Sequence, residues 1–548
     1  MRRYRQIGVT LALIIVVLMF SFINLEGVPP LWWDEGWTLS VARNWVESGH
    51  YGLLRNGAPR LAGLSGHFPI VVSVALSFRL FGVGIWQGRL PGVLHTLAAF
   101  LLIFHLARRL YGRPVAFGAI AMLLFLSASD QLHPILAGRQ VLGETHAMAY
   151  LLAGYIFLLA ALDRSGWFIV PAALMWAIAL QTKAQIRPFW LLSILLPMGV
   201  ALYKRHGRAA ALSGIGLSGS LVGSWGISWL HQAMVGGQFL AEPIEGLYFV
   251  TAFVPNLSVR LIALRIAIAY GAPVLLGVGW AAWEVFRTLK KSFLATRHPG
   301  KMKPKIGGWV GCTPHPTPNF RDFLAFVSGV EIVKLAFLGL VGSWLAWYLF
   351  FAMFWVRYLF PVLFMGSIFA AAFIYRATER FDLLAVARKF SGAIRAWRRG
   401  RPRVRDLIIG TGRLILVSWM MVAFFYTATV FYLVYIVFPQ GSVVDVTDYL
   451  NANTDPDALI ETYESELFFL LDRRYHYPPD QLHVQLIQHQ YLDPSTPVDY
   501  DPLVSDPDYL VTGAFSSQFG LYDKTLAANE FRLIAGFPGY QIYERVRE

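Results

Sequence analysis

Two adjacent carboxylates, Asp34 and Glu35, stand in the segment WWDEGW, where tryptophans surround them. Charged groups among large apolar side chains carry a desolvation cost that a purely structural role does not require. Carboxylates in such surroundings suit proton transfer, because a base can remove a proton from an attacking group. The alternative is that Asp34 caps the start of a helix, which accounts for Asp34 but leaves Glu35 and the tryptophans unexplained.

A second acid and a base, Glu144 and Arg139, occur together in the segment AGRQVLGETHAMAY. Residues five apart on a helix do not share a face, so we expect no direct ion pair between them unless Arg139 precedes the helix. The alternative makes Arg139 a side chain that reaches out of the membrane interface and Glu144 a helix-start acid favoured by the helix dipole.

Three more residues, Lys183, Arg357 and Tyr358, lie in short turns between apolar segments. Lys183 is followed by Arg187 in TKAQIRP, and Arg357-Tyr358 stands in WVRYLFP. Lysine and arginine can hold a phosphate through charge and hydrogen bonds, or can simply reach toward water from a membrane interface. The choice depends on which side of a membrane these turns face, and therefore on the apolar segments between them.

The chain has 548 residues, of which 56% are hydrophobic and only 15% are charged. Soluble domains carry about a quarter charged residues, so the composition excludes a water-soluble globular protein. Apolar runs long enough to cross a bilayer predict a polytopic α-helical membrane protein with about eleven transmembrane helices. They are the basic N-terminal segment to about residue 24, then 88–109, 113–130, 141–162, 166–181, 188–203, 208–231, 258–286, 326–350, 358–376 and 409–438.

The basic residues orient these spans, because cytoplasmic loops are enriched in lysine and arginine. If the N-terminus is cytoplasmic, the segments that fall on the cytoplasmic side hold more than half of the 47 basic residues. We therefore expect a multi-pass protein of the cell membrane, with residues around Asp34, Glu144, Lys183 and Arg357 on the extracytoplasmic side. Basic residues are disfavoured on that side, which favours a functional role for Lys183 and Arg357.

The first external loop, 26–87, is rich in tryptophan. Trp37, Val41 and Trp45 share one helical face, which predicts a helix lying in the outer interface. If the apolar run 68–82 crossed the membrane, every later loop would lie on the opposite side. We therefore interpret this run as a juxtamembrane or re-entrant helix.

The last part of the chain, 441–548, differs in composition from 1–440: it holds 18 acidic and 6 basic residues, although the whole chain carries a net charge of +14. An odd number of spans places it outside the cytoplasm as a small α/β domain. Strands are expected at 458–461, 483–487, 509–511 and 531–534, helices at 443–449 and 464–471, and a terminal hairpin turning at 536–539.

The segment 298–318 is rich in proline, glycine and lysine and is expected to be a flexible cytoplasmic linker. It contains the single cysteine, Cys312, which cannot form an intramolecular disulfide. The sequence shows no Cys/His spacing typical of a structural zinc site, so no metal ligands are assigned.

Acids and bases are thus expected on one side of the membrane, the acids suited to deprotonating an attacking group and the bases to a phosphate. This set fits a phosphate-linked substrate presented from the lipid. It consists of Asp34, Glu35, Glu144, Arg139, Lys183 and Arg357.

Several segments resemble the GT-C glycosyltransferases, in the branch that holds protein O-mannosyltransferases and aminoarabinose lipid A transferases. The resemblance begins in WWDEGWTLSVARNWVESGHYG and continues through GHFPIVVSVALSFRLFGVGIWQGRLPGVLHTLAAFLLIFHLARRLYGR. It also includes an acidic motif in AGRQVLGETHAMAYLLAGY, a Thr-Lys segment in LQTKAQIRPFWLLSILLP and an Arg-Tyr segment in VRYLFPVLF. It covers the membrane part and, more weakly, the C-terminal domain.

The resemblance implies a GT-C fold and an inverting transferase that takes a hexose or pentose from a polyprenyl-phosphate donor on the extracytoplasmic side. Asp34 would be the general base, and Glu35 would orient it or the acceptor. Glu144 and His67 would position the acceptor or the sugar, and the donor phosphate would be held by Arg139, Lys183, Arg357 and Tyr358. The sequence departs from the usual pattern in two places: His67-Phe68-Pro69 replaces His-Pro-Pro, and Glu144 stands where aspartate is frequent.

Two other classes compete with an enzyme. A transporter or flippase for lipid-linked sugars would place charged residues near the bilayer midplane and show repeat symmetry, whereas these charges gather at one surface. A noncatalytic glycan-binding subunit would leave the acids and bases unexplained. No cofactor is required, although Asp34 and Glu35 could hold a divalent cation. The partners expected are the lipid bilayer, the lipid-linked sugar and an unidentified acceptor, and not a nucleic acid.

Overall fold

The structure is a computed structural model that describes residues 2–62, 66–127, 129–235, 252–297, 328–399, 404–437 and 442–547, together with 245, 247 and 248. The linker predicted at 298–318, with Cys312, and the boundary at residue 441 lie outside the described residues.

Most of the chain forms a bundle of long apolar helices. A helix is favoured in lipid because it satisfies its backbone hydrogen bonds within one segment. Within the described ranges, eight helices are long and apolar enough to cross a membrane. They are α4 (Ile85–Tyr111), α7 (Gly143–Asp163), α9 (Ile186–Tyr203), α10 (Gly207–Met234), α12 (Leu257–Arg297), α14 (Gly329–Phe350), α15 (Phe360–Ala377) and α17 (Val404–Tyr432).

Three further helices of the bundle contain shorter apolar stretches: α1 (Arg2–Phe22), α5 (Arg113–Phe125) and α8 (Ile169–Thr182). Each of the eleven predicted spans therefore corresponds to a helix. The largest difference is at the end of α12, which continues to Arg297 although its predicted span ends at residue 286, whereas α5 ends five residues before its predicted span. The turn before α5 is set by Gly112, whose φ of +91° favours glycine, and by Pro114 in its first turn.

Between α1 and α4, the chain forms α2 (Trp33–Ser48), the hairpin of β1 (Leu53–Arg55) and β2 (Ala58–Arg60), and α3 (Phe68–Phe81). α3 occupies the run that we expected to be juxtamembrane, and it packs between α2 and α4. The short helix α6 (Pro134–Arg139) and the 3-10 turns η2 (Gly166–Phe168) and η3 (Val356–Leu359) connect helices of the bundle.

The C-terminal region contains a five-stranded sheet of order β4-β3-β5-β7-β6. β3 is parallel to β4 and β5, whereas β7 is antiparallel to β5 and β6. The elements are α18 (Ser442–Asn453), β3 (Leu459–Thr462), η5 (Ser465–Leu467), β4 (Arg474–His476), α19 (Asp480–Tyr491), η6 (Pro502–Ser505), β5 (Tyr509–Thr512), α20 (Ala514–Phe519), α21 (Asp523–Ala527), β6 (Phe531–Phe537) and β7 (Tyr540–Arg545).

The structure confirms the expected strands at β3, β5 and β6, the helix α18 and the terminal hairpin, but corrects three expectations in this region. Residues 483–487 belong to helix α19 and not to a strand. Only a 3-10 turn, η5, forms within the helix expected at 464–471, and the strand β4 was not expected.

The first-loop helices share one hydrophobic core with the C-terminal region. The ring of Trp37 packs edge-on against Phe468 and Tyr477, at 5.5 and 5.1 Å between centroids, and Phe78 stacks on Phe469 at 5.8 Å. The apolar face of α2, which we expected to face the membrane interface, is therefore buried against protein.

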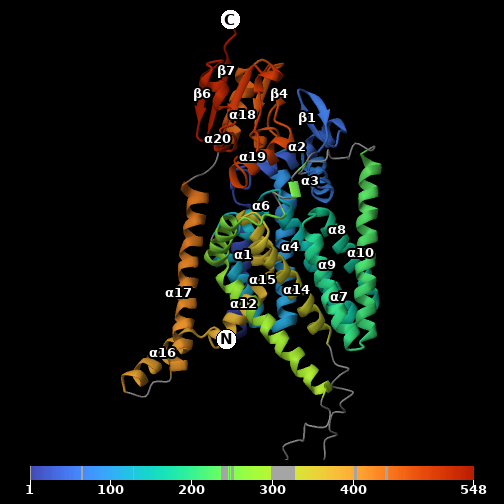
Figure 1. Cartoon of the computed structure of the whole chain (residues 1–548), viewed down its shortest axis with the longest axis vertical. Helices are drawn as coiled ribbons and strands as arrows, with labels where there is room; N and C mark the ends of the chain where they lie inside the picture. Colours follow the sequence, from blue (N-terminus) through green and yellow to red (C-terminus); the bar gives the residue numbers. More distant parts are fainter. Residues whose placement is uncertain are drawn as a thin grey trace, which may run out of the picture.

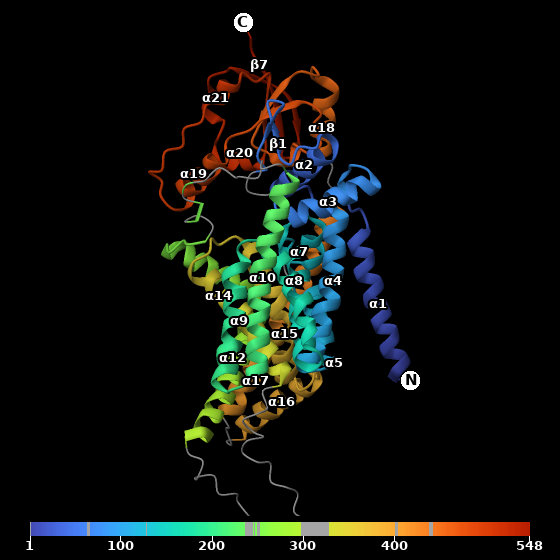
Figure 2. The same cartoon turned by 90° about the vertical axis from the view of Figure 1, so that its right-hand side faces the viewer.

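The N-terminus and the C-terminal region lie at opposite ends of the bundle (Figures 1 and 2). α2 and α3 lie between the bundle and the C-terminal region, whereas α16 (Leu383–Arg398) lies at the end that carries the N-terminus. This arrangement agrees with the expected odd number of crossings between the two termini.

Candidate functional site

A cavity of about 250 Å³ lies where the bundle meets α2 and the C-terminal region. Its walls come from segments far apart in the sequence: the start of α2, His67 before α3, the start of α7, the turn between α8 and α9, the turn η3, and α19. Six of the eight residues singled out in the sequence line it, namely Asp34, His67, Glu144, Lys183, Arg357 and Tyr358.

The start of α2 brings Asp34 to the cavity. The residue before the helix is Trp32, whose backbone N–H donates to the Glu35 side chain at 3.3 Å. Asp34 is thus in the first turn and is not the cap, so the capping interpretation is wrong. The Asp34 carboxylate forms an ion pair with Arg357 from η3, and both side chains are about a quarter exposed.

The C-terminal region fixes this end of α2. The indole N–H of Trp33 donates to the carbonyl of Tyr463 at 2.9 Å, and the Ser465 hydroxyl donates to the carbonyl of Trp33 at 2.7 Å. A Cβ on Gly36 would lie 2.2 Å from the Ser465 carbonyl oxygen. Glycine is therefore required at this close approach, which holds Asp34 in place.

A second ion pair joins Glu144, at the start of α7, to Lys183, directly after α8. The Glu144 side chain is 6% exposed and that of Lys183 is 16% exposed. The two cations of the cavity also share a neighbour, since Lys183 Nζ and Arg357 Cζ each lie 5.9 Å from the centre of the Tyr358 ring. Two acids and two bases therefore face one small space.

His67 contributes an uncharged polar group to the same cavity. Burial, together with the positive charge of Lys183, lowers the pKa of His67 from its usual 6.5 to about 4. At neutral pH the imidazole is neutral and can donate one hydrogen bond and accept another.

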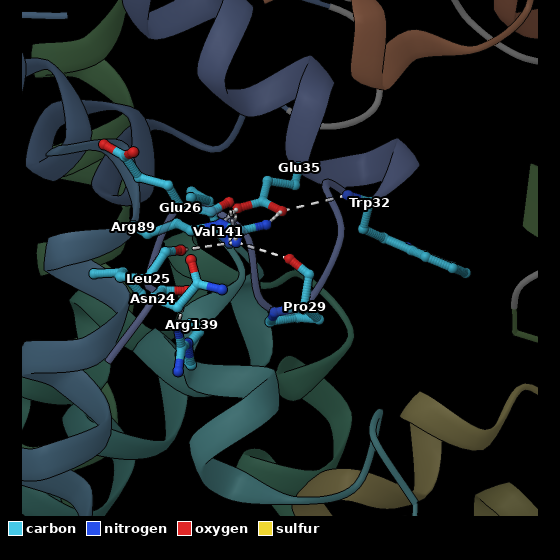
Figure 3. Close-up of polar contacts among 9 residues, drawn as sticks. All are labelled: Asn24, Leu25, Glu26, Pro29, Trp32, Glu35, Arg89, Arg139 and Val141. Carbon is cyan, nitrogen blue, oxygen red and sulfur yellow. Dashed lines mark hydrogen bonds and ion pairs between the residues drawn. The ribbon is translucent and has the colours of Figure 1, made fainter. Parts of the chain in front are cut away.

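Glu35, in contrast, does not line the cavity. Its carboxylate is fully buried and accepts two hydrogen bonds of 2.8 Å from Arg89 of α4, as Figure 3 shows. Arg89 also donates to the backbone carbonyls of Leu25, Glu26 and Pro29. The pair ties α2 to α4 and to the chain that follows α1. Because Asp34 and Glu35 have different partners, they do not form a two-carboxylate cation site.

Arg139 also lies away from the cavity. Its guanidinium donates to the carbonyls of Phe20, Ile23 and Asn24 at 2.8, 2.7 and 2.5 Å, and to the hydroxyl of Tyr435. The side chain is fully buried at the end of α1. Its contacts hold the end of α1 against α6.

Residues of the cavity to which the sequence analysis gave no role include Trp33, Trp355 and His483. His483 comes from α19, and its ring stacks on Trp33 with 4.7 Å between centroids. A signal for this helix is present in Pro478-Pro479-Asp480, since prolines and an acid are typical of a helix start.

Comparison with known proteins connects this site to a class. A family model described as dolichyl-phosphate-mannose-protein mannosyltransferase matches residues 69–223, which include Glu144 and Lys183. No match is found among curated protein sequences.

Two solved proteins are similar to the chain in fold. ArnT from Cupriavidus metallidurans in the apo state has a TM-score of 0.60 at 14% identity, over 99% of this chain and 98% of that one. The same protein bound to undecaprenyl phosphate has a TM-score of 0.55 at 14% identity, over 98% of each chain. The oligosaccharyltransferase of Archaeoglobus fulgidus in the apo form has a TM-score of 0.51 at 10% identity, over 95% of this chain and 72% of that one.

The chain is therefore an integral membrane protein with the GT-C fold, the fold of membrane glycosyltransferases. This confirms the fold class expected from the sequence. The alternative of a transporter for lipid-linked sugars has no support in these comparisons.

Proposed function

We propose that this protein is an inverting glycosyltransferase that moves a hexose or pentose from a polyprenyl-phosphate donor to a hydroxyl group of an extracytoplasmic acceptor. The observation that carries this proposal is the cavity in which Asp34, Glu144, Lys183 and Arg357 meet. ArnT, which shares the fold, binds undecaprenyl phosphate. The family match, whose description names a dolichyl-phosphate-linked sugar, supports the same class of donor.

The bases of the cavity would hold the donor phosphate. In the structure, Arg357 pairs with Asp34 and Lys183 pairs with Glu144. A phosphate offers these cations stronger partners, because it presents several charged oxygens to the guanidinium fork and the ammonium group. Once the bond to the sugar breaks, the same cations would stabilise the charge on the leaving lipid phosphate.

Asp34 would act as the general base. When Arg357 turns to the phosphate, the Asp34 carboxylate loses its cationic partner and becomes a better proton acceptor. It then removes the proton from the acceptor hydroxyl while the hydroxyl oxygen attacks the anomeric carbon. The bond between that carbon and the phosphate oxygen breaks, and the lipid phosphate leaves. A single displacement of this kind inverts the configuration at the anomeric carbon.

The remaining candidate residues would act around this step. Glu144 and His67, which line the cavity, would position the acceptor or the sugar. Glu35 would act on Asp34 only through helix α2, since its own carboxylate is bound to Arg89. Arg139, whose hydrogen bonds go to backbone carbonyls and a tyrosine hydroxyl, would hold α1 in place and would not bind phosphate.

We propose that the cavity and the domain 441–548 face the extracytoplasmic side, with the N-terminus and residues 298–318 in the cytoplasm. Single cysteines introduced into a Cys312→Ser background would test this orientation with a membrane-impermeant reagent. A cysteine at Ser505 should be labelled in intact cells, and a cysteine at position 300 should not. Labelling at position 300 from outside would overturn the orientation.

The activity itself can be tested in cells that make either the native protein or Asp34→Asn. Mass spectrometry of envelope lipids and surface glycans should find a sugar addition that depends on the native protein and is lost with Asp34→Asn at equal protein level. If the two cell types carry identical lipids and glycans, the proposed transfer is wrong.

A further inference from the structure

The C-terminal region contributes one ionisable side chain to the cavity, His483 of α19. Its ring lies flat against Trp33, with 4.7 Å between centroids and 21° between planes. Trp33 directly precedes Asp34. The imidazole and the base of the proposed reaction therefore line the same cavity, although they come from opposite ends of the sequence.

The protonation state of His483 follows from its surroundings. Burial, together with the positive charge of Arg357, lowers the pKa of His483 from 6.5 to about 4, so the ring is neutral at physiological pH. Other charged groups near α19 are Asp480, one turn earlier in the helix, and Glu464, beside Tyr463.

Tyr463 determines which ring nitrogen carries the proton. Its hydroxyl is hydrogen-bonded to Nδ1 of His483. Burial and the negative charge of Glu464 raise the pKa of Tyr463, so the phenol keeps its proton; among the described residues, Nδ1 of His483 is the acceptor that this O–H reaches. A neutral imidazole that accepts at Nδ1 carries its hydrogen on Nε2.

The Nε2–H group is thus a fixed donor on a ring that lines the cavity. Among the residues that the structure describes, Nδ1 of His483 has a hydrogen-bond partner and Nε2 has none. The neighbouring charge is the guanidinium of Arg357, which lowers the pKa of the ring and whose partner is Asp34. Two donors that meet in this way suit a ligand that carries negative charge on several oxygens.

We propose that Nε2 of His483 donates a hydrogen bond to the phosphate of the polyprenyl-phosphate ligand, so that the C-terminal region completes the phosphate site. This inference rests on the proposed function and extends it to a residue outside the membrane bundle. A neutral donor fits here because it stabilises a phosphate oxygen without adding a second buried cation beside Arg357. Tyr463 is then a positioning residue that acts through the imidazole.

Two amide substitutions separate this role from a structural one. Glutamine places its amide near the position of Nε2, whereas asparagine places its amide near Nδ1 and cannot reach as far. The probe is undecaprenyl phosphate, titrated into the purified full-length protein in detergent. We expect His483→Asn to weaken binding about tenfold, the effect of losing one hydrogen bond to a charged group, and His483→Gln to restore most of it. Tyr463→Phe should weaken binding two- to threefold, because the tautomer is no longer fixed.

The matched control is His489→Asn, on the same helix but exposed and bonded to the carbonyl of Thr496. It should bind undecaprenyl phosphate as the native protein does. Undecaprenol, which lacks the phosphate, should bind equally to all of these variants. An effect of His483→Asn on undecaprenol would show that the histidine acts on the lipid tail or on folding, and would overturn the inference.

Arg357→Ala distinguishes this inference from the proposed function. If Arg357→Ala loses affinity for undecaprenyl phosphate while His483→Asn keeps it, His483 is not a phosphate ligand and the proposed function stands. If neither variant loses affinity, the cavity is not the phosphate site, and both proposals are wrong.

Discussion

Replacing Arg89 by methionine should destabilise the protein strongly, because it leaves the Glu35 carboxylate buried without its cation. Both side chains are 0% exposed. After the substitution, Glu35 would keep only two long hydrogen bonds, from the backbone N–H groups of Trp32 and Val141 at 3.3 Å each. Removing one partner of a buried ion pair costs roughly 3–5 kcal/mol, so we expect a large fall in melting temperature.

Glu35→Gln should cost less, because Arg89 keeps its three backbone carbonyl acceptors and gains a neutral amide oxygen. Of the two hydrogen bonds that Glu35 accepts from Arg89, one is lost and the other is weakened, and the loss of one hydrogen bond to a charged group costs roughly 1.5–3 kcal/mol. The double variant Glu35→Gln/Arg89→Met leaves no buried carboxylate, so it should be less damaging than the sum of the two single variants.

Thermal unfolding of the native protein, the two single variants and the double variant in one detergent gives the double-mutant cycle, and transfer activity is measured on the same samples. Arg376→Met is a suitable control, since Arg376 is 68% exposed and pairs with Glu284. Activity should fall in proportion to the loss of folded protein. If Glu35→Gln keeps the native melting temperature but abolishes transfer while Asp34→Asn transfers normally, the roles of these two acids have been assigned the wrong way round.

Three further predictions concern the cavity. Asp34→Asn should lower turnover by roughly 10²–10⁴-fold, the scale of general-base catalysis, while undecaprenyl phosphate binding is kept; normal turnover would exclude Asp34 as the base. Lys183→Ala and Arg357→Ala should each weaken undecaprenyl phosphate binding by roughly 1.5–3 kcal/mol, and Arg357→Lys should recover part of the affinity. Unchanged binding in both alanine variants would mean that these side chains only reach toward water from the membrane interface. His67 binds a proton in the unfolded chain near pH 6.5 but in the folded protein only near pH 4, so its contribution to stability is lost as the pH falls between these values. The native protein should therefore lose about 2 kcal/mol more stability than His67→Phe between pH 7.5 and pH 5, and equal shifts in melting temperature for the two proteins would contradict the buried neutral state.

The membrane helices could be predicted from the sequence because lipid imposes a local rule. A segment that crosses a bilayer must be apolar along its length and must satisfy its own backbone, so hydropathy alone places it. Lys183 and Arg357 stood out for the same reason, since both occupy turns where the membrane disfavours basic residues. These inferences need no knowledge of which helices are neighbours.

The partners of the charged residues could not be predicted, because they depend on packing between distant segments. Glu35 looked catalytic beside Asp34, yet its partner is Arg89, 54 residues further along the chain. Arg139 looked like a phosphate ligand until the structure showed carbonyls of α1 around its guanidinium. In both cases a buried charge is satisfied by protein, and the sequence cannot distinguish this from a charge that awaits a ligand.

His483 was missed for a related reason. The run HVQLI alternates polar and apolar residues, which is typical of a strand, but α19 buries Leu482, Val484, Leu486 and Ile487 against two different surfaces. A short helix that packs against two hydrophobic cores has apolar residues on two faces, so its sequence does not show the helical spacing of a single apolar face. Its position over the cavity follows from contacts between the C-terminal region and α2.

The charge balance of the cavity suggests why two acids and two bases are found together. The pairs Asp34–Arg357 and Glu144–Lys183 leave no net charge in a small space, which lowers the cost of keeping the site partly buried. In the proposed reaction, a lipid phosphate that enters would take up the cations and release the carboxylates. In the proposed reaction, Asp34 would become a free base only when the donor is in place, and the acceptor hydroxyl would be deprotonated only where a sugar is ready to receive it. On this proposal Arg357 would pair with the base until the donor phosphate takes up the guanidinium, so the residue that binds the phosphate would also control when the reaction begins.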